Sequence, residues 1–336
     1  MNEDERTPEP EIIHTPPEFV VAEEEFHTPA GEEIIAGTSL WKDAWRRLLK
    51  NRLAVFGMIV VILVAIASLI GPEIIKRVNG FGPDYIPSDS QLIKSFAPFK
   101  APDGSFSWKH PMGTDNQGRD IMARVLQGGQ ISLMVGIIAT IVSLLIGVAY
   151  GAVAGYLGGR IDNLMMRFVD ILYSLPYIIL VIVLLAMFRS STAVGQLVLL
   201  FIALGSVSWL TMARIVRGQV LSLKNQEFVL AARATGVSTA RIIFRHIVPN
   251  TLGPVIVYAT LTIPTVMLSE AFLSYLGFGV QPPLASWGSL ASDGIQNIAI
   301  FPWQLIFPGL TMALTLFSLN FLGDGLRDAL DPQMRK

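Results

Sequence analysis

Six long runs without a charged side chain are the feature that most limits what this chain can fold into. Each holds roughly the 20 residues that a helix needs to cross the hydrocarbon core of a bilayer. A soluble protein can bury one such run, but not six, and Asp, Glu, Lys and Arg make up only 15% of the chain, against about 25% in ordinary soluble proteins. The runs therefore predict an all-helical integral membrane protein. They comprise residues 53–72, 125–159, 171–188, 190–213, 246–269 and 294–323.

A seventh uncharged stretch, 271–292, does not suit a regular span. It contains three glycines and the pair Pro282-Pro283. A helix through these prolines would lose backbone hydrogen bonds that lipid cannot replace. We interpret this stretch as the end of the fifth span followed by a non-helical or re-entrant segment buried against protein.

The placement of Lys and Arg favours six spans over seven. Five basic residues lie in 41–52, two between the second and third spans, six between the fourth and fifth, and three after the sixth. The opposite side has Arg189 and a long first loop with seven basic residues, and loops of that length are weak indicators of sidedness. The pattern predicts that both termini are cytoplasmic.

The net charge of −1 hides two oppositely charged parts of the chain. Residues 1–40 carry eleven acidic residues against Arg6 alone, a charge of −10, and the remainder carries +9. This tail lacks a sustained apolar period, which predicts disorder. Five regions follow from these patterns. They are the acidic cytoplasmic tail 1–40, a basic amphipathic flank with the first span in 41–72, an extracytoplasmic loop in 73–124, a five-helix core in 125–323 with a cytoplasmic connector at 214–249, and a cytoplasmic tail in 324–336.

The chain lacks the residues that several kinds of site chemistry require. The absence of cysteine excludes disulfides and Cys-based metal sites, and the four histidines are too scattered for a zinc pair on a helix. No Gly-Lys dipeptide occurs, so a phosphate-binding P-loop is excluded. The charge balance does not suit nucleic acid. We expect no catalytic residues, no metal ligands and no cofactor bound by this chain.

The cytoplasmic connector is the most informative segment. Residues 227–235 have high helix propensity, and Gly236 then suits a left-handed helix end. Ser238 is placed to cap a second helix over 239–246, which leads to Pro249. Two short helices with a glycine bend fit either a surface that a partner grips or an ordinary amphipathic connector.

The connector resembles the signature loop of ABC importer permeases, written Glu-Ala-Ala, three residues, Gly, nine residues, Ile, one residue, Leu-Pro. Ala231, Ala232, Gly236 and Pro249 match it at the right spacing. The chain departs from it at Leu230, His246 and Val248, which stand where the pattern has Glu, Ile and Leu. In the peptide and nickel subfamily the acidic residue lies three positions earlier, and Glu227, Phe228 and Arg233 are typical of that variant.

Three further segments are similar to the C-type permease subunit of dipeptide and oligopeptide importers. They are 110–120, 275–288 and 320–332, so that the resemblance covers roughly 41–336. It implies a six-span type I ABC importer transmembrane domain in a prokaryotic cytoplasmic (inner) membrane. The implied partners are a homologous second permease subunit, two ATP-binding subunits that bind ATP and magnesium, an extracytoplasmic peptide-binding protein and the lipid bilayer. The helix around 228–236 would be the coupling helix on one ATP-binding subunit.

Within the spans, three features deserve a prediction. Gly147, Gly151 and Gly155 recur at every fourth position, which favours close helix packing. Glu270 is the one carboxylate near a span interior, and we expect it near the outer end, where water reaches it. Glu270 and Trp287 are candidate gate or path residues, and Glu270 is also placed to hold the segment 277–287.

Alternatives to a peptide importer stay open at this point. Nickel or another small solute is the closest rival within the family. An ion-coupled secondary transporter would need buried acidic or histidine residues, and the first four spans offer almost none. A membrane scaffold without transport would dock no ATP-binding subunit.

Overall fold

The computed structural model describes residues 40–89, 94–101 and 103–330. The acidic tail, apart from Leu40, and the last six residues lie outside the described part of the chain. The predicted fold class is confirmed, because the described residues form helices, with two isolated β-bridges in the first loop. The elements in chain order are α1 (Leu40–Lys50), α2 (Arg52–Asn79), α3 (Ile121–Leu157), α4 (Gly159–Tyr173), α5 (Tyr177–Met187), α6 (Ala193–Leu223), α7 (Glu227–Ala234), α8 (Thr239–Arg241), a π-helix (Ile242–Ile247), α9 (Val248–Tyr275), α10 (Trp287–Gln296) and α11 (Trp303–Leu330).

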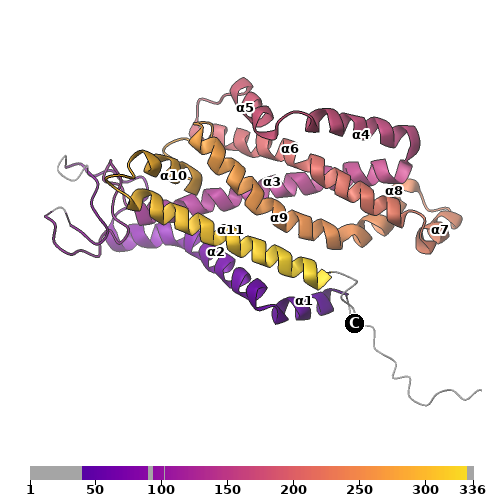
Figure 1. Cartoon of the computed structure of the whole chain (residues 1–336), viewed down its shortest axis with the longest axis horizontal. Helices are drawn as coiled ribbons and strands as arrows, with labels where there is room; N and C mark the ends of the chain where they lie inside the picture. The colour runs from indigo at the N-terminus through magenta and orange to yellow at the C-terminus, as the bar shows by residue number, and fades with distance from the viewer. Residues whose placement is uncertain (1–39, 90–93, 102, 331–336) are drawn as a thin grey trace, which may run out of the picture. The chain divides into compact units, whose positions relative to one another are not determined.

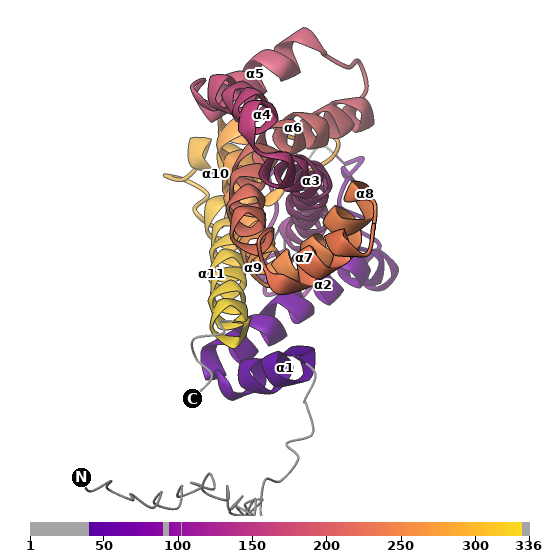
Figure 2. The same cartoon turned by 90° about the vertical axis from the view of Figure 1, so that its right-hand side faces the viewer.

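Helix α3 lies at the centre of the helices. It packs along α6 and also contacts α9, α2 and α10, whereas α11 lies between α2 and α9 (Figures 1 and 2). The predicted glycine packing is confirmed: a Cβ on Gly147 would lie 2.6 Å from the Cβ of Met212, and one on Gly155 would lie 3.0 Å from the carbonyl oxygen of Arg217. These small residues let the backbones of α3 and α6 approach closely.

Five of the helices are long and apolar enough to cross a membrane, and a sixth span exists if the bent pair α4 and α5 counts as one. The predicted third span, 171–188, is wrong as a single helix. The chain bends by 82° between α4 and α5, at residues 174–176. Leu175 precedes Pro176, and the proline ring disfavours helical backbone at the preceding residue.

Two other predicted boundaries need correction. Helix α6 continues to Leu223, so the first part of the predicted connector 214–249 belongs to that helix. The last uncharged run, 294–323, joins the end of α10 to α11, which begins at Trp303 and extends to Leu330 through all of the described part of the predicted tail. Absence of charge marks apolar surroundings, but it does not mark where a helix begins or ends.

The stretch 271–292 is divided between three elements. Helix α9 ends at Tyr275, residues 276–286 are irregular, and α10 begins at Trp287. Ala285 and Ser286 are fully buried, which agrees with the expected irregular segment packed against protein. The short helix α10 was not predicted. Its capping box, formed by Ser286 and Ser289, satisfies backbone N–H groups at its start.

The predicted helix in the basic flank is confirmed as α1, and apolar contacts hold it against α2 and α11. Ala44 and Leu48 are buried and pack with Ala54 of α2 and Ala329 of α11. Asn51 accepts hydrogen bonds from the backbone N–H groups of Leu53 and Ala54, so it caps α2. The first and last long helices are therefore joined at this end of the bundle.

Candidate functional site

Helix α7 forms where the connector predicts it. Glu227 lies in its first turn and Arg233 in its last, which suits the helix dipole at both ends. Gly236 has φ +75°, a left-handed conformation that glycine adopts at little cost. The N–H groups of Gly236 and Val237 bond to the carbonyls of Arg233 and Ala232 respectively. This is the Schellman pattern of a helix end.

Open space surrounds Gly236. Apart from its chain neighbours, no atom of the described residues lies within 4 Å of the position that a Cβ would take. The left-handed φ angle is therefore the reason for glycine here.

Helix α7 has one buried and one exposed face. Val229 and Ala232 are buried, whereas Phe228 and Leu230 are 40% and 48% exposed and Ala231 is also exposed. The predicted coupling residues therefore divide into two groups. Ala232 faces the protein, and the residues at solvent are Glu227, Phe228, Ala231, Arg233, Gly236 and Pro249. We call the exposed side chains of Phe228, Leu230 and Ala231 the outer face of α7.

The buried face of α7 rests on an apolar cluster drawn from four helices. Val229 and Ala232 belong to a cluster of buried residues that also includes Val220 of α6 and Ile243 of the π-helix, and α7 contacts the π-helix directly. Members of the same cluster come from α3 and α9. The buried face of α7 is therefore part of a close-packed interior that it shares with several long helices.

Two basic side chains add polar links in the same place. The guanidinium of Arg233 lies 5.4 Å from the centroid of the Tyr156 ring on α3. Lys224 donates a hydrogen bond from Nζ to the carbonyl oxygen of Gly155, 3.1 Å away, near the end of α3. Both contacts join the connector to α3.

The predicted second helix, 239–246, is not a separate element. Helix α8 passes directly into the π-helix and then into α9, and Ser238 makes no side-chain capping bond. Pro249 explains the π-helix, because its ring has no N–H and crowds the carbonyl four residues earlier. The wider turns bond the N–H of Val248 to the carbonyl of Ile243. The connector thus continues without a break into the fifth predicted span.

Ion pairs tie α4 to α6 on the same side of the bundle. Arg217 donates two hydrogen bonds to Asp162, at 2.6 and 2.7 Å, and Arg214 donates one to Asp170, at 2.7 Å. Arg214 also lies 4.1 Å from the centroid of the Tyr173 ring. The pairs fix α4 although the chain bends after it.

At the opposite end of the bundle, Glu270 is fully buried, which corrects the expectation that water reaches it. Its Oε1 atom accepts hydrogen bonds from Ser274 and Ser286, both at 2.7 Å. Ser286 ends the irregular segment after α9, so Glu270 connects α9 to that segment. The contact joins the two segments that the sequence expected Glu270 to hold, and its holding and gate roles stay predictions.

Trp287 is likewise fully buried. It donates from Nε1 to the carbonyl of Val125, at 2.8 Å, and its backbone N–H donates to Ser132, at 3.0 Å. Gly129 leaves room for the indole, because a Cβ there would lie 2.8 Å from the ring. The contacts anchor α10 on α3, whereas a path-lining role for Trp287 stays a prediction.

The sequence reasoning missed a polar cluster beside α10. Gln304 of α11 donates from Nε2 to Ser95, to the carbonyl of Thr114 and to Asn116, at 2.9 to 3.3 Å. Trp303 also donates to the carbonyl of Thr114. The partners lie some 190 residues apart, and a single uncharged glutamine gives no local signal of such a role.

The long apolar helices define a membrane-spanning protein. Residues 147–336 match the family described as binding-protein-dependent transport system inner membrane component. Residues 39–91 match the N-terminal transmembrane domain of oligopeptide transport permease C. The chain belongs to this family of bacterial inner-membrane ABC importer permeases.

Curated relatives cover nearly the whole chain. The oligopeptide transport system permease protein OppC of Salmonella typhimurium is 49% identical over 90% of this chain and 94% of its own length. OppC of Bacillus subtilis is 45% identical, over 89% and 91%. The dipeptide transport system permease protein DppC of Bacillus subtilis is 42% identical, over 99% and 98%.

A solved structure supports the fold. A chain from inward-facing conformations of the MetNI methionine ABC transporter aligns with a TM-score of 0.50 and 21% identity. The alignment covers 63% of this chain and 98% of that chain. At this identity the similarity bears on the fold alone.

Proposed function

We propose that the chain is a transmembrane permease subunit of an ATP-driven importer for peptides. The relatives named for oligopeptide and dipeptide transport support this substrate class. A homologous second permease subunit supplies the other half of the path. An extracytoplasmic binding protein delivers the peptide, and both termini of this chain lie in the cytoplasm.

Two partner ATP-binding subunits, which bind ATP and magnesium, supply the energy for transport. The observation that supports this part of the proposal is the exposed outer face of α7, which offers a docking surface. A helix of eight residues is about 12 Å long and moves as one body. One ATP-binding subunit contacts the outer face of α7, at Phe228, Leu230 and Ala231. The ends of the helix are fixed by Glu227, Arg233 and Gly236. Closure of the ATP-binding subunits displaces α7.

The displacement reaches the path through the buried face of α7. Val229 and Ala232 press on the π-helix, which is continuous with α9. Lys224 and Arg233 carry the same movement to α3. Rigid-body movement of these helices then exchanges an inward-facing for an outward-facing cavity.

The test compares two identical substitutions on the assembled transporter in nanodiscs. Ala231→Asp places a carboxylate on the outer face of α7, and Ala240→Asp places one on exposed α8. We expect peptide-stimulated ATP hydrolysis to fall at least tenfold in the first variant and to persist in the second, since a misplaced charge at a docked surface costs several kcal/mol. Equal, unimpaired stimulation in both would overturn the assignment of α7.

Gly236→Arg is a second probe, because it adds a bulky side chain at a left-handed position without filling any space inside the protein. We expect loss of coupling with the membrane helices still folded. Ala232→Asp is a poorer probe, since Ala232 is buried and a charge there disturbs the packing itself.

A further inference from the structure

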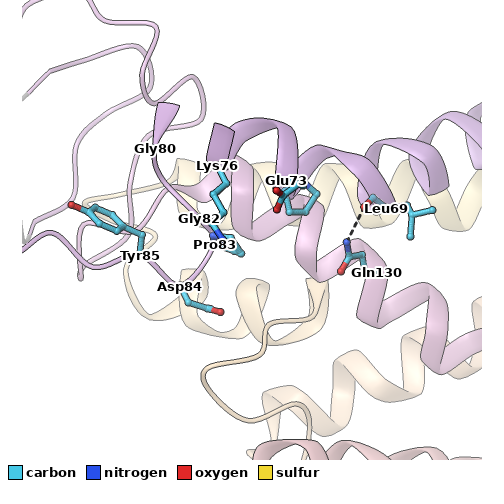
Figure 3. A pocket seen from close by; sticks show the side chains of 10 residues that line it. Leu69, Glu73, Lys76, Gly80, Gly82, Pro83, Asp84, Tyr85 and Gln130 are labelled. Atoms are coloured by element: carbon cyan, nitrogen blue, oxygen red, sulfur yellow. Dashed lines mark hydrogen bonds between the residues drawn. The ribbon is translucent and has the colours of Figure 1, made fainter. Parts of the chain in front are cut away.

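An open cleft lies at the far end of α2 from α1 (Figure 3). Its volume is about 500 Å³, within the range of sites that hold small molecules. The walls come from the last turns of α2, the segment 80–85 that follows it and Gln130 of α3. The lining residues that matter here are Leu69, Glu73, Lys76, Asp84 and Tyr85.

The cleft sits where the apolar part of α2 meets its polar end. Residues 53–72 carry no charge, and Glu73 and Lys76 are the first charged residues beyond them on this face. The cleft therefore spans the boundary between hydrocarbon and water, the position of lipid head groups.

A proline and a glutamine shape the floor of the cleft. Pro72 has no N–H for the carbonyl of Ser68, four residues earlier. Gln130 replaces that bond, donating from Nε2 to the oxygen of Ser68 at 2.7 Å. It also donates to the oxygen of Leu69, at 3.3 Å (Figure 3). The contact joins α2 to α3 under the cleft and keeps α2 helical through the proline.

An apolar stripe leads out of the cleft along α2. Ile62, Ile66, Leu69, Glu73 and Lys76 follow one another at spacings of three or four residues, so they share a face of the helix. Ile62 and Ile66 are exposed, and Leu69 is 72% exposed. One molecule with a polar head in the cleft and a hydrocarbon tail on this stripe would cover both surfaces.

The charges in the cleft select the head group. Glu73 and Asp84 are carboxylates, which accept hydrogen bonds from an ammonium, and Lys76 attracts a phosphate. Arg77, outside the lining, donates to Glu73 at 3.0 Å and occupies one of its two oxygens. A quaternary ammonium offers no N–H, and a purely anionic head group meets the carboxylate of Asp84 beside Lys76, with Glu73 already paired to Arg77.

We propose that this cleft binds a glycerophospholipid whose head group carries a primary ammonium and a phosphate. The ammonium lies between Glu73 and Asp84, the phosphate lies on Lys76, and an acyl chain follows Leu69, Ile66 and Ile62. Tyr85, which also lines the cleft, has the amphipathic ring that is enriched at membrane interfaces.

The test measures lipid association with the full chain in nanodiscs by electron spin resonance of spin-labelled lipids. The probes are phosphatidylethanolamine, phosphatidylcholine and phosphatidylglycerol with identical labelled chains. We expect the ethanolamine lipid to associate about fivefold or more above the other two, as charge-assisted hydrogen bonds imply. Lys76→Gln and the pair Glu73→Gln with Asp84→Asn should each remove that preference.

Lys100→Gln is the matched control, because this lysine is exposed in the first loop outside the cleft. It should leave the preference unchanged. Equal association of the three lipids, or the same preference in the cleft variants, would overturn the proposal. So would loss of the ethanolamine preference on assembly with the second permease and ATP-binding subunits, since the stripe would then be a protein interface.

Discussion

The two ends of the helix bundle are held together by different forces. Around α10, buried polar groups dominate: Glu270, Trp287 and Gln304 donate or accept six hydrogen bonds that join different segments of the chain. Around α7, apolar contacts of Val229 and Ala232 dominate. Buried hydrogen bonds depend on direction, whereas the hydrophobic effect does not. The comparison indicates a rigidly positioned end at α10 and an end at α7 that can move as it transmits force.

The largest effect is expected at the α10 end. Trp287→Ala removes the buried indole and its hydrogen bond to Val125, and we expect a loss of about 3–5 kcal/mol in the free energy of unfolding. Trp108→Ala is the control, since Trp108 is 71% exposed and its loss should cost less than about 1 kcal/mol. Denaturant unfolding in detergent measures both. Comparable losses would contradict the anchoring role of Trp287.

Close packing near the α7 end predicts a smaller effect. Gly147→Ala would push its Cβ against Met212 and separate α3 from α6, at a cost of about 1–3 kcal/mol. Gly218→Ala on α6 meets no atom within 4 Å, so we expect no loss or a small gain from helix propensity. The same unfolding measurement distinguishes them. A tolerated alanine at 147 would mean that the contact between α3 and α6 is looser than the structure shows.

The Glu270 contact should contribute less again. Glu270→Gln keeps the acceptor oxygen but weakens both hydrogen bonds, and we expect a loss of about 1 kcal/mol together with a modest reduction in transport. A double-mutant cycle with Ser286→Ala should show coupling between the two positions. Strictly additive losses in the free energy of unfolding, or unchanged transport, would contradict a role for Glu270 in holding this end of the bundle.

The smallest expected effect is a pH dependence from Asp293 of α10. Burial raises the pKa of the Asp293 carboxyl, and Arg124 and Arg119 offset part of that increase. The folded protein therefore binds a proton that the unfolded chain has released, so stability falls as pH rises from 3.8, the ordinary value, through the raised pKa. Asp293→Asn should flatten this part of the pH profile. The measurement is the free energy of unfolding as a function of pH. The same pH dependence in the wild type and in Asp293→Asn would contradict the role of Asp293.

Several features of the fold could be predicted from short-range patterns. The spans follow from uncharged runs, because lipid excludes charge, and the end of α7 follows from the glycine that its left-handed backbone requires. Pro176 is also a local signal for the bend before α5. The continuous run of apolar residues around it nevertheless favoured a single span. The α6 boundary was missed because Arg214 and Arg217 are compatible with helix once they pair with α4.

The tertiary contacts could not be predicted in the same way. Which face of α7 is buried depends on the rotation of the helix against α6 and the π-helix, and an eight-residue helix with several alanines has only a weak apolar stripe. Trp287 meets Ser132 across a separation of 155 residues. Residue type reveals that an indole needs a partner, but only the folded arrangement of α3 and α10 identifies it.

The central claim is that the outer face of α7 contacts an ATP-binding subunit, and the absence of cysteine in the chain allows a direct test. Ala231→Cys introduces a single exposed thiol on α7, and Trp108→Cys introduces one on the first loop. The measurement is the rate of maleimide labelling of each variant, alone and assembled with the ATP-binding subunits. The account predicts strong protection at position 231 on assembly and none at 108. Equal labelling at position 231 in the free and assembled states would contradict it.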